Sequence, residues 1–596
     1  MATYYVAGQT GSDSNSGTTE TAPLKTMPSG AGTGDTIYCS EQIRDSSGNA
    51  ATITYTNKSN MVIAQWPGKP QAVFCGDSTP LATSGWSASS NAWTKTIATG
   101  MTIGAVVYKW DVLTTSTGQH YGFLQSDTAA NVQAGTGSTG KYNYNSATGL
   151  LTVYLGGDNP NTSGYAVIYC RDDSVPAAIK FAGGTRNTVT GVNFRLYPVT
   201  SGQTGWGVMF NPSTYGRVEN CRADSMGIHA FGTLGGGDCS YCSITNCQVY
   251  DVRPDGSGYV FFQENAYGTL TGCRMSNCYV GCSRWRGLDA APLTGLSSNT
   301  QAGVAMHSDT GTTVTDCIIT GCTFRSFTDD YGAEPFGASQ AVAPTDGWDF
   351  NTYPIKADLC RFVGWTFMRH LRYAAYRRCI IDLVNCGPSG QCTSAYALSA
   401  ASGTILESCL VLLDSTTGGF VALTGATNAV GADLRFLNCS IFDRNTSLTD
   451  QRYMFSLAYS SNGFVRARGC VCAYAPTSGS PTYMRLFAAD DTVPAANHDF
   501  MDNAYFVQGG VYSSNTSYDS QSEFSSAIDT RAKFLSTCPF QTSGTNLIPI
   551  AGGELQSLSR AGTDAIPKDG VDQYAYRGYF GAHQGPFHST GSSRSA

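Results

Sequence analysis

The sequence predicts an all-β protein built as a right-handed, single-stranded parallel β-helix, a solenoid of about ten or more coils. Three observations predict this fold: one short phrase recurs, each phrase has the pattern of two inward-facing strands, and an Asn or Gly stands between the two. The phrases begin at Cys242, Cys273, Cys317 and Cys360, so successive starts lie 31, 44 and 43 residues apart. A fixed phrase at variable spacing indicates stacked coils with loops of different lengths.

Each phrase predicts a strand, a bend of one residue and a second strand. The first cysteine and the residue two positions later share one face of a strand, because side chains alternate between faces. The second cysteine, or Trp365 in the fourth phrase, begins another such face. The alternation slips by one residue at Asn246, Asn277, Gly321 and Gly364. Asn and Gly adopt the left-handed backbone conformation that such a bend requires.

The same frame extends in both directions and predicts a column of residues that directly follow the bends. This column comprises Val192, Cys221, Cys247, Cys278, Cys322, Trp365, Cys386, Cys409, Cys439 and Cys470. Most of the 21 cysteines therefore face inward, and free cysteine behaves as a small buried apolar residue. We expect a ladder of reduced thiols, with disulfides between neighbouring coils as the alternative. A zinc site is the weaker alternative, with ligands from Cys239, Cys242, Cys247 and His229.

Composition restricts the classes of partner. The 596 residues carry a net charge of −7, and 13 % are charged while 41 % are hydrophobic. These values are typical of a turn-rich β protein and argue against a nucleic-acid partner. No apolar run approaches the roughly 18–20 residues of a membrane helix. The first residues contain no basic and apolar leader, so we expect a chain that remains in a cytoplasm, one that leaves by lysis, or one expressed without its leader.

Four regions are expected along the chain. Residues 1–79 form an N-terminal cap with the first coils, 80–168 an inserted small β domain, 169–480 the β-helix, and 481–596 the last coils, a closing segment and a flexible tail. The insertion contains a β-hairpin around an Ala-Thr-Gly turn. Its tryptophans are expected to form the core of a small sandwich, with a carbohydrate-binding face as the alternative; they are Trp86, Trp93 and Trp110.

The two longest steps of the repeat mark the expected site. They place extra loops within residues 282–316 and 325–358, and long loops on a rigid scaffold often carry function. Because they belong to adjacent coils, we expect one rim over a groove. The candidate substrate-binding residues are Arg284, Trp285, Arg286, Tyr331 and Trp348. The candidate catalytic residues are Asp330, Glu334, Asp346 and Asp349.

Two chemistries fit these loops. Paired carboxylates across a groove suit glycoside hydrolysis. Carboxylates that hold calcium beside a base such as Lys356 suit a polysaccharide lyase. The alternative is that the acids serve only as turn and solubility residues. Asp13 and Asn15 are a second place for calcium, where a plain turn is favoured, so calcium is left open and no metal ligand is assigned.

A basic run follows the second loop. It comprises Arg369, His370, Arg372, Arg377 and Arg378. These side chains could bind an acidic polysaccharide, although a solvated face or a contact with another subunit is the favoured interpretation.

Several segments carry a family resemblance. The opening contains Tyr4-Tyr-Val, Gly11-Ser-Asp13-Ser-Asn15 and Gly34-Asp35-Thr. It resembles the cap of carbohydrate-active parallel β-helix proteins, the pectate-lyase-like superfamily, which includes phage tailspikes and polysaccharide lyases. The segments 63–70, 141–155 and 572–583 resemble the next coil, the insertion and the closing segment of these proteins. Residues 345–350 faintly resemble a calcium-holding segment of family 9 pectate lyases. The resemblance implies the fold and a homotrimer.

Three functions compete, and the fold does not separate them. The favoured one is a bacteriophage virion appendage, a tailspike or tail fibre, that recognises a host cell-surface polysaccharide and is a candidate depolymerase. The alternatives are a stand-alone polysaccharide lyase or glycoside hydrolase, and a non-enzymatic decoration protein of a virion. We expect a homotrimer that contacts other virion proteins and is located in the virion, or is secreted. Whether the chain is an enzyme, and which glycan it recognises, is left open.

Overall fold

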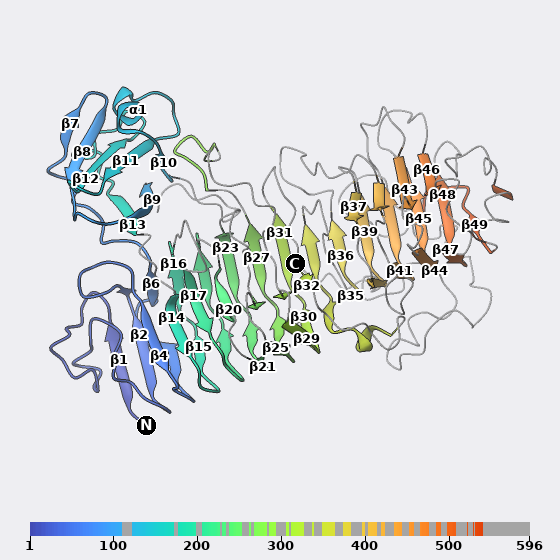
Figure 1. Cartoon of the computed structure of the whole chain (residues 1–596), viewed down its shortest axis with the longest axis horizontal. Helices are drawn as coiled ribbons and strands as arrows, with labels where there is room; N and C mark the ends of the chain where they lie inside the picture. The colour runs from blue at the N-terminus through green and yellow to red at the C-terminus, as the bar shows by residue number, and fades with distance from the viewer. Residues whose placement is uncertain are drawn as a thin grey trace. The chain divides into compact units, whose positions relative to one another are not determined.

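A computed structural model shows that β-strands make up nearly all the regular secondary structure in the described part of the chain (Figure 1). The structure describes residues 1–109, 122–171, 177–197, 205–226, 229–233, 238–252, 261–263, 268–282, 285–291, 293, 306–308, 312–326, 336–338, 349–363, 374–382, 396–399, 403–413, 419–422, 434–443, 452–457, 465–475, 484–489, 498–507, 521–522, 529 and 531–539. The chain divides into two compact units. Unit 1 comprises Met1–Gly268 and Met275–Ala305, and unit 2 comprises Thr269–Arg274 and Met306–Ala596. No helix in the described part of the chain is long and apolar enough to cross a membrane.

Unit 1 stacks its coils through parallel sheets. The leading sheet precedes the bend of each coil and contains β1 (Thr3–Ala7), β2 (Thr36–Ser40), β5 (Val62–Gln65), β15 (Thr188–Thr190), β18 (Arg217–Glu219) and β22 (Ser243–Thr245). The trailing sheet follows the bend and contains β3 (Gln42–Ile43), β6 (Val73–Cys75), β16 (Asn193–Arg195), β19 (Arg222–Asp224), β23 (Gln248–Val252) and β27 (Tyr279–Cys282). A third sheet contains β4 (Ile53–Thr56), β14 (Ala177–Ala182), β17 (Trp206–Phe210) and β20 (Phe231–Thr233).

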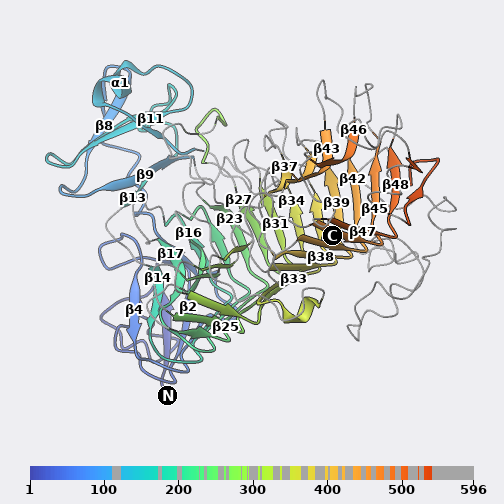
Figure 2. The same cartoon turned by 45° about the vertical axis from the view of Figure 1, so that its right-hand side comes forward.

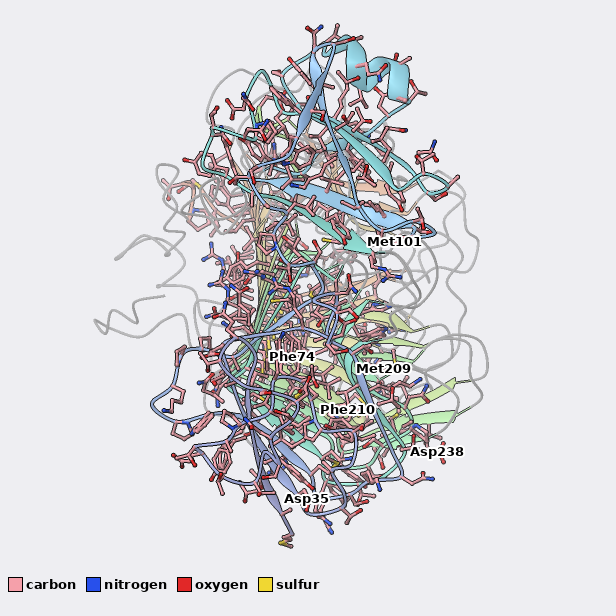
Figure 3. All side chains as sticks on the ribbon, turned by 90° about the vertical axis from the view of Figure 1, so that its left-hand side faces the viewer. Asp35, Phe74, Met101, Met209, Phe210 and Asp238 are labelled. Carbon is pink, nitrogen blue, oxygen red and sulfur yellow. The ribbon has the colours of Figure 1, made fainter. Side chains whose placement is uncertain are left out.

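The core of unit 1 lies between these sheets. Phe74 stacks on Phe194 at 5.3 Å between ring centroids, and Phe181 stacks on Phe210 at 5.5 Å. Figure 3 labels Phe74, Met209 and Phe210, all buried among the sheets. Such ladders of like residues are what stacked parallel coils produce.

The inserted segment of unit 1 forms two sheets and one short helix; its strand pairs are antiparallel except for β10 with β11, which is parallel. Its elements are β7 (Ser87–Ser89), β8 (Ala92–Thr96), β9 (Ile103–Tyr108), β10 (Gln125–Ser126), α1 (Ala129–Ala134), β11 (Lys141–Asn145), β12 (Leu150–Tyr154) and β13 (Val167–Arg171). The predicted hairpin is confirmed, because β11 and β12 pair with Asn145 opposite Leu150. Trp86 is buried in the core of this domain, and Trp93 packs against that core. Trp110 lies outside the described residues. The boundaries of the four regions stay a prediction.

Unit 2 repeats the same plan. Its leading sheet contains β30 (Cys317–Thr320), β33 (Ile355–Asp358), β35 (Ala374–Arg377), β38 (Ile405–Glu407), β41 (Leu434–Leu437), β44 (Val465–Arg468) and β47 (His498–Met501). Its trailing sheet contains β31 (Thr323–Ser326), β34 (Arg361–Val363), β36 (Ile380–Asp382), β39 (Leu410–Leu413), β42 (Ser440–Asp443), β45 (Val471–Tyr474), β48 (Ala504–Val507) and β49 (Lys533–Phe534). A further sheet contains β37 (Tyr396–Ser399), β40 (Gly419–Ala422), β43 (Arg452–Leu457) and β46 (Met484–Ala489).

Short elements complete the two units. They are β21 (Cys239–Ser240), β24 (Phe261–Gln263), β25 (Gly268–Thr271), β26 (Arg274–Ser276), β28 (Met306–Ser308), β29 (Thr312–Thr315), β32 (Phe336–Ala338) and the 3₁₀ turn η1 (Phe350–Thr352). With parallel pairing from coil to coil in both units, the predicted right-handed parallel β-helix is confirmed.

The bends between leading and trailing strands are single residues with positive φ. Among the described residues they include Glu41, Gly191, Asn220, Asn246 and Asn277 in unit 1, and Gly321, Leu359, Arg378, Ser408, Asn438, Gly469 and Asp502 in unit 2. The predicted register is therefore wrong at two coils. Cys360 follows a bend at Leu359 instead of beginning a phrase, so the bends step by 38 and then 19 residues from Gly321. The predicted column members Trp365 and Cys386 lie outside the described residues.

In unit 2 the residues that follow the bends form a column of buried thiols. It comprises Cys322, Cys360, Cys379, Cys409, Cys439 and Cys470. Cys439 is typical: its Sγ lies 3.3 Å from the Leu406 carbonyl oxygen of the preceding coil and 3.6 Å from that of Leu437. Burial raises the pKa of Cys379 and of Cys439. The predicted inward column of cysteines is confirmed for these positions, and none of the six is in a disulfide in this structure.

Candidate functional site

Three of the nine predicted site residues lie in the part of the chain that the structure describes. Arg284, Asp330, Tyr331, Glu334, Asp346 and Trp348 lie outside the described residues. Of the predicted set, the structure describes Trp285 and Arg286 in unit 1 and Asp349 in unit 2.

The segment around Trp285 serves the packing of unit 1. The Trp285 ring stacks on Phe123 at 4.4 Å with an interplanar angle of 5°, and the residue is 2 % exposed. The Arg286 carbonyl oxygen accepts hydrogen bonds from the Gly122 and Phe123 N–H groups at 3.0 and 3.1 Å. In this structure Trp285 has almost no ring surface open to a sugar. A substrate-binding role of Arg286 stays a prediction.

Asp289 adds hydrogen bonds between the segment around Trp285 and the inserted domain. Its Oδ2 accepts hydrogen bonds from Ser138 Oγ at 2.7 Å and Thr139 Oγ1 at 2.8 Å. This carboxylate, from the first long loop, therefore fastens the loop to the inserted domain.

Asp349 begins the segment in which the second long loop returns to the coil. Its Oδ1 accepts a hydrogen bond from the Asn351 N–H at 2.8 Å, so the carboxylate caps η1. Behind it, Phe350 and Tyr353 are each 1 % exposed and pack against Ala375 and Ile405. Figure 2 shows this short turn in yellow-green beside β33.

The return segment packs on the outward side of the leading sheet of unit 2. Tyr376 faces the core, where its ring meets Phe362 edge to face at 5.8 Å. Because side chains alternate along a strand, its neighbours Ala375 and Arg377 face outward. Ile405 pairs with Ala375 and shares that outward row. The loop that was expected to carry function is thus anchored on a defined row of outward side chains.

A partly buried charged cluster lies on the same side of the sheet. We define it by Lys356, Asp358, Arg377, Arg378 and Glu407, which belong to three neighbouring coils. The Arg377 guanidinium stands 4.2 Å from the Phe350 ring centroid. The cluster therefore adjoins the return segment and its first residue, Asp349.

Asp358 is the centre of the charged cluster. Its Oδ2 accepts a hydrogen bond from Arg377 Nη2 at 3.0 Å, and its Oδ1 accepts one from Arg378 Nε at 2.8 Å. Burial lowers the pKa of Arg377, but the hydrogen bond and charge of Asp358 outweigh it, so the pKa of Arg377 is raised. Asp358 thereby holds two cationic groups in fixed positions.

Lys356 and Glu407 complete the charged cluster. Lys356 Nζ lies 2.9 Å from Asp316 Oδ1, and Asp316 Oδ2 lies 3.4 Å from Arg274 Nη2. Glu407 pairs in register with Arg377 on the next coil and is 4 % exposed. Three cations and two carboxylates thus stand within a few coils, in positions that the apolar core does not require.

The sequence pattern alone did not identify this cluster. It identified Arg377 and Arg378 as part of a basic run but gave no role to Asp358 or Glu407. Finding them requires the strand register, because only the bend at Leu359 shows that Asp358 points outward beside Arg377. That register is hidden in the sequence, since Leu is a poor signal for a left-handed bend.

The residues considered for metal binding have other contacts. Asp13 Oδ1 accepts hydrogen bonds from the Lys25 and Thr26 N–H groups and from Thr26 Oγ1, so it joins two segments of the cap. The His229 ring packs on Trp206 at 4.1 Å. Among the described residues, no three His, Cys, Asp or Glu side chains gather as a metal site would need.

Comparisons with known proteins found similar solved structures only. No protein family matches the sequence, and no curated protein matches it. The complex of XylC with xylose is 10 % identical with a TM-score of 0.46, and the match covers 90 % of this chain and 86 % of that one. The tailspike protein gp49 from Pseudomonas phage LKA1 is 15 % identical with a TM-score of 0.33, and the match covers 85 % of this chain and 76 % of that one. Pectate lyase Pel9A is 12 % identical with a TM-score of 0.32, and the match covers 98 % of this chain and 96 % of that one. Each is a likeness at low identity, and the function proposed below rests on the residues of this chain.

Proposed function

We propose that this chain recognises polysaccharide through the charged cluster of unit 2, as an appendage of a phage virion that binds a host cell-surface glycan. The observation that supports the proposal is the position of the cluster. Its charged side chains face away from the core, beside the return segment of the second long loop. Charges at such partly buried positions are costly unless they are paired or used.

The chemistry of the cluster suits a glycan. Guanidinium groups bind carboxylates and hydroxyl oxygens in fixed geometry, and Arg378 is the most exposed of the hydrogen-bonded trio, with 24 % of its side chain open against 13 % for Arg377 and 8 % for Asp358. Coils repeat at about 4.8 Å, so an extended polymer lying across them meets one row of side chains after another. An acidic polysaccharide is the ligand that this balance of groups favours.

Cleavage of the bound polysaccharide is the second candidate. Asp349 stands at the edge of the charged cluster and is one of the predicted catalytic acids, together with Asp330, Glu334 and Asp346. Hydrolysis needs two such carboxylates across the scissile bond. A lyase needs a base beside the bound sugar, and Lys356, which follows the second long loop, forms an ion pair with Asp316.

Binding and product analysis together test these functions. The purified chain is applied to an array of bacterial capsular polysaccharides and lipopolysaccharides, and bound glycans are then incubated with it. We expect specific binding. Unsaturated products, detected by ultraviolet absorbance, indicate a lyase, and new reducing ends alone indicate a hydrolase. If neither product forms, the chain binds the glycan without cleaving it. Absence of binding to every glycan contradicts the proposal and favours the decoration protein.

The catalytic assignment has its own test. If cleavage occurs, Asp346→Asn and Asp349→Asn are expected to abolish it while the thermal unfolding midpoint changes little, because Asn can still cap η1 through its oxygen. Unchanged turnover in both variants contradicts the assignment.

A homotrimer and contacts with other virion proteins belong to the same proposal, and light scattering of the purified chain tests the trimer.

A further inference from the structure

A second column of left-handed bends leads into the strands of the leading sheet of unit 1. It contains Asn60, Arg186, Tyr215 and Tyr241, with φ between 55° and 58°. The chain thus turns at the same corner in successive coils. Two of these corners carry a tyrosine, which is unfavourable there because a bulky side chain crowds the backbone in this conformation.

The chain has an alternative at this corner and uses it elsewhere. Asn60 occupies an equivalent bend, and Gly272 precedes Cys273 with a φ of 61° in the same position of the repeat. Asn and Gly tolerate the left-handed conformation much better than Tyr. The turn alone therefore does not explain why two successive coils have tyrosine. The backbone strain at these bends would be lower with Asn or Gly, so its presence indicates that the tyrosine side chains themselves have a function.

The two tyrosine rings form an exposed stack. Their centroids lie 5.2 Å apart with an interplanar angle of 14°. Tyr215 is 40 % exposed and Tyr241 is 49 % exposed. Arg186, from the preceding coil, places its guanidinium carbon 5.4 Å from the Tyr215 ring centroid. Three side chains from three coils are thus arranged in one row at the corner of the solenoid.

We propose that Tyr215 and Tyr241, with Arg186 at the end of the row, are a stacking platform for a sugar ring of an extended polysaccharide. This inference rests on the proposed function and assigns it a second contact region, in unit 1. The apolar C–H face of a sugar can lie on an aromatic ring, while tyrosine hydroxyls and a guanidinium hydrogen-bond its hydroxyl edge. Rigid aromatic side chains bind at little entropic cost, because few torsions must be fixed.

A sugar fits this surface better than a protein partner. In the described part of the chain the other large apolar side chains that are well exposed are Met1, Leu150, Tyr165 and Leu359, none of which belongs to this bend column. A protein interface has an apolar centre within roughly 800 Å² per partner. Two tyrosines and an arginine make a narrow row instead, which suits a chain of sugars.

The test uses the full chain and an array of bacterial capsular polysaccharides and lipopolysaccharides. Tyr241→Asn removes the ring and relieves the bend, so the thermal unfolding midpoint is expected to stay or to rise. The affinity for the glycan that the unchanged protein binds is expected to fall about tenfold or more, as for loss of one stacked ring. Tyr241→Phe keeps the ring and is expected to bind nearly as the unchanged protein does, whereas Tyr241→Leu keeps apolar bulk without the flat ring and is expected to bind weakly.

The outcomes separate this inference from the function on which it rests. If the unchanged protein binds no glycan on the array, both fall. If it binds and Tyr241→Asn binds equally well, the platform is refuted while the proposed function stands. If Tyr241→Leu binds as well as Tyr241→Phe, the ring does not stack on a sugar, and an apolar protein contact replaces it. A lower unfolding midpoint for Tyr241→Asn assigns the stack to stability and also overturns the inference.

Discussion

At the scale of single residues, the bends of unit 2 determine which side chains face outward. Leu359 and Arg378 occupy two of these bends with φ of 56° and 54°. Neither residue type favours this conformation, whose strain is about 1 kcal/mol or more for a side chain of ordinary size. Leu359 is also 41 % exposed, so packing offsets little of that strain.

Leu359→Asn is therefore expected to stabilise the protein. Asn adopts the left-handed conformation with less strain, and the exposed Leu side chain contributes little burial. We expect a gain of about 0.5–1 kcal/mol, measured as an upward shift of the urea midpoint at unchanged slope. Ser408→Asn, at the buried bend of the coil after Arg378, serves as the comparison. A downward shift for Leu359→Asn contradicts the account of the bend.

These residues also show how far a sequence pattern reaches. Asn246, Asn277 and Gly321 were predicted as bends and are bends, because their residue types indicate the conformation locally. Leu359 and Arg378 were missed, since their conformation is set by the stacking of neighbouring coils and not by their own preference. The error shifted Cys360 to the wrong side of a bend and concealed the charged cluster, which depends on that register.

At the scale of elements, the thiol column of unit 2 ends in a buried polar group. Asn503 follows the last bend, at Asp502, and its Oδ1 accepts a hydrogen bond from the Cys470 N–H at 2.8 Å. Asp529 Oδ2 in turn accepts from Asn503 Nδ2 at 2.9 Å and from the Tyr505 hydroxyl at 3.1 Å. Polar groups thus close the apolar interior after the last cysteine of the column.

The Asp529 carboxyl is expected to make stability depend on pH. Burial raises its pKa above the ordinary value of 3.8, although its hydrogen bonds oppose the shift. The folded state therefore holds the proton more tightly than the unfolded state, and stability falls as pH rises from 3.8 through the raised pKa. Asp529→Asn is expected to remove this pH-dependent contribution to stability. The difference in urea midpoint between the variant and the unchanged protein is therefore expected to change between pH 3.8 and the raised pKa. A constant difference contradicts the assignment.

The site was less predictable than the elements that carry it. The two long steps of the repeat indicated where loops would lie, and the return segment at Asp349 does pack on the sheet beside charged residues. Asp358 and Glu407 could not be recognised as partners of Arg377, because their neighbourhood exists only when three coils are stacked in register. Tyr215 and Tyr241 were missed for the same reason.

At the scale of the whole molecule, we propose one contact region for a polymer in each unit. Unit 2 presents the charged cluster, and unit 1 presents the tyrosine platform. Contacts distributed over many coils suit a long ligand, since each contributes modestly and their sum sets the affinity. The phage appendage, the stand-alone enzyme and the decoration protein differ in whether such a ligand is bound and whether it is cut.

The most direct test of the proposed function measures polysaccharide affinity for Arg378→Asn against Leu359→Asn. Both changes place Asn at adjacent bends of the same column, but only the first removes a guanidinium from the charged cluster. We predict that Arg378→Asn weakens binding of the recognised glycan about tenfold or more, as expected for loss of a charge-assisted hydrogen bond, while Leu359→Asn binds as the unchanged protein does. Equal affinities in all three proteins would contradict a role of the charged cluster in glycan binding.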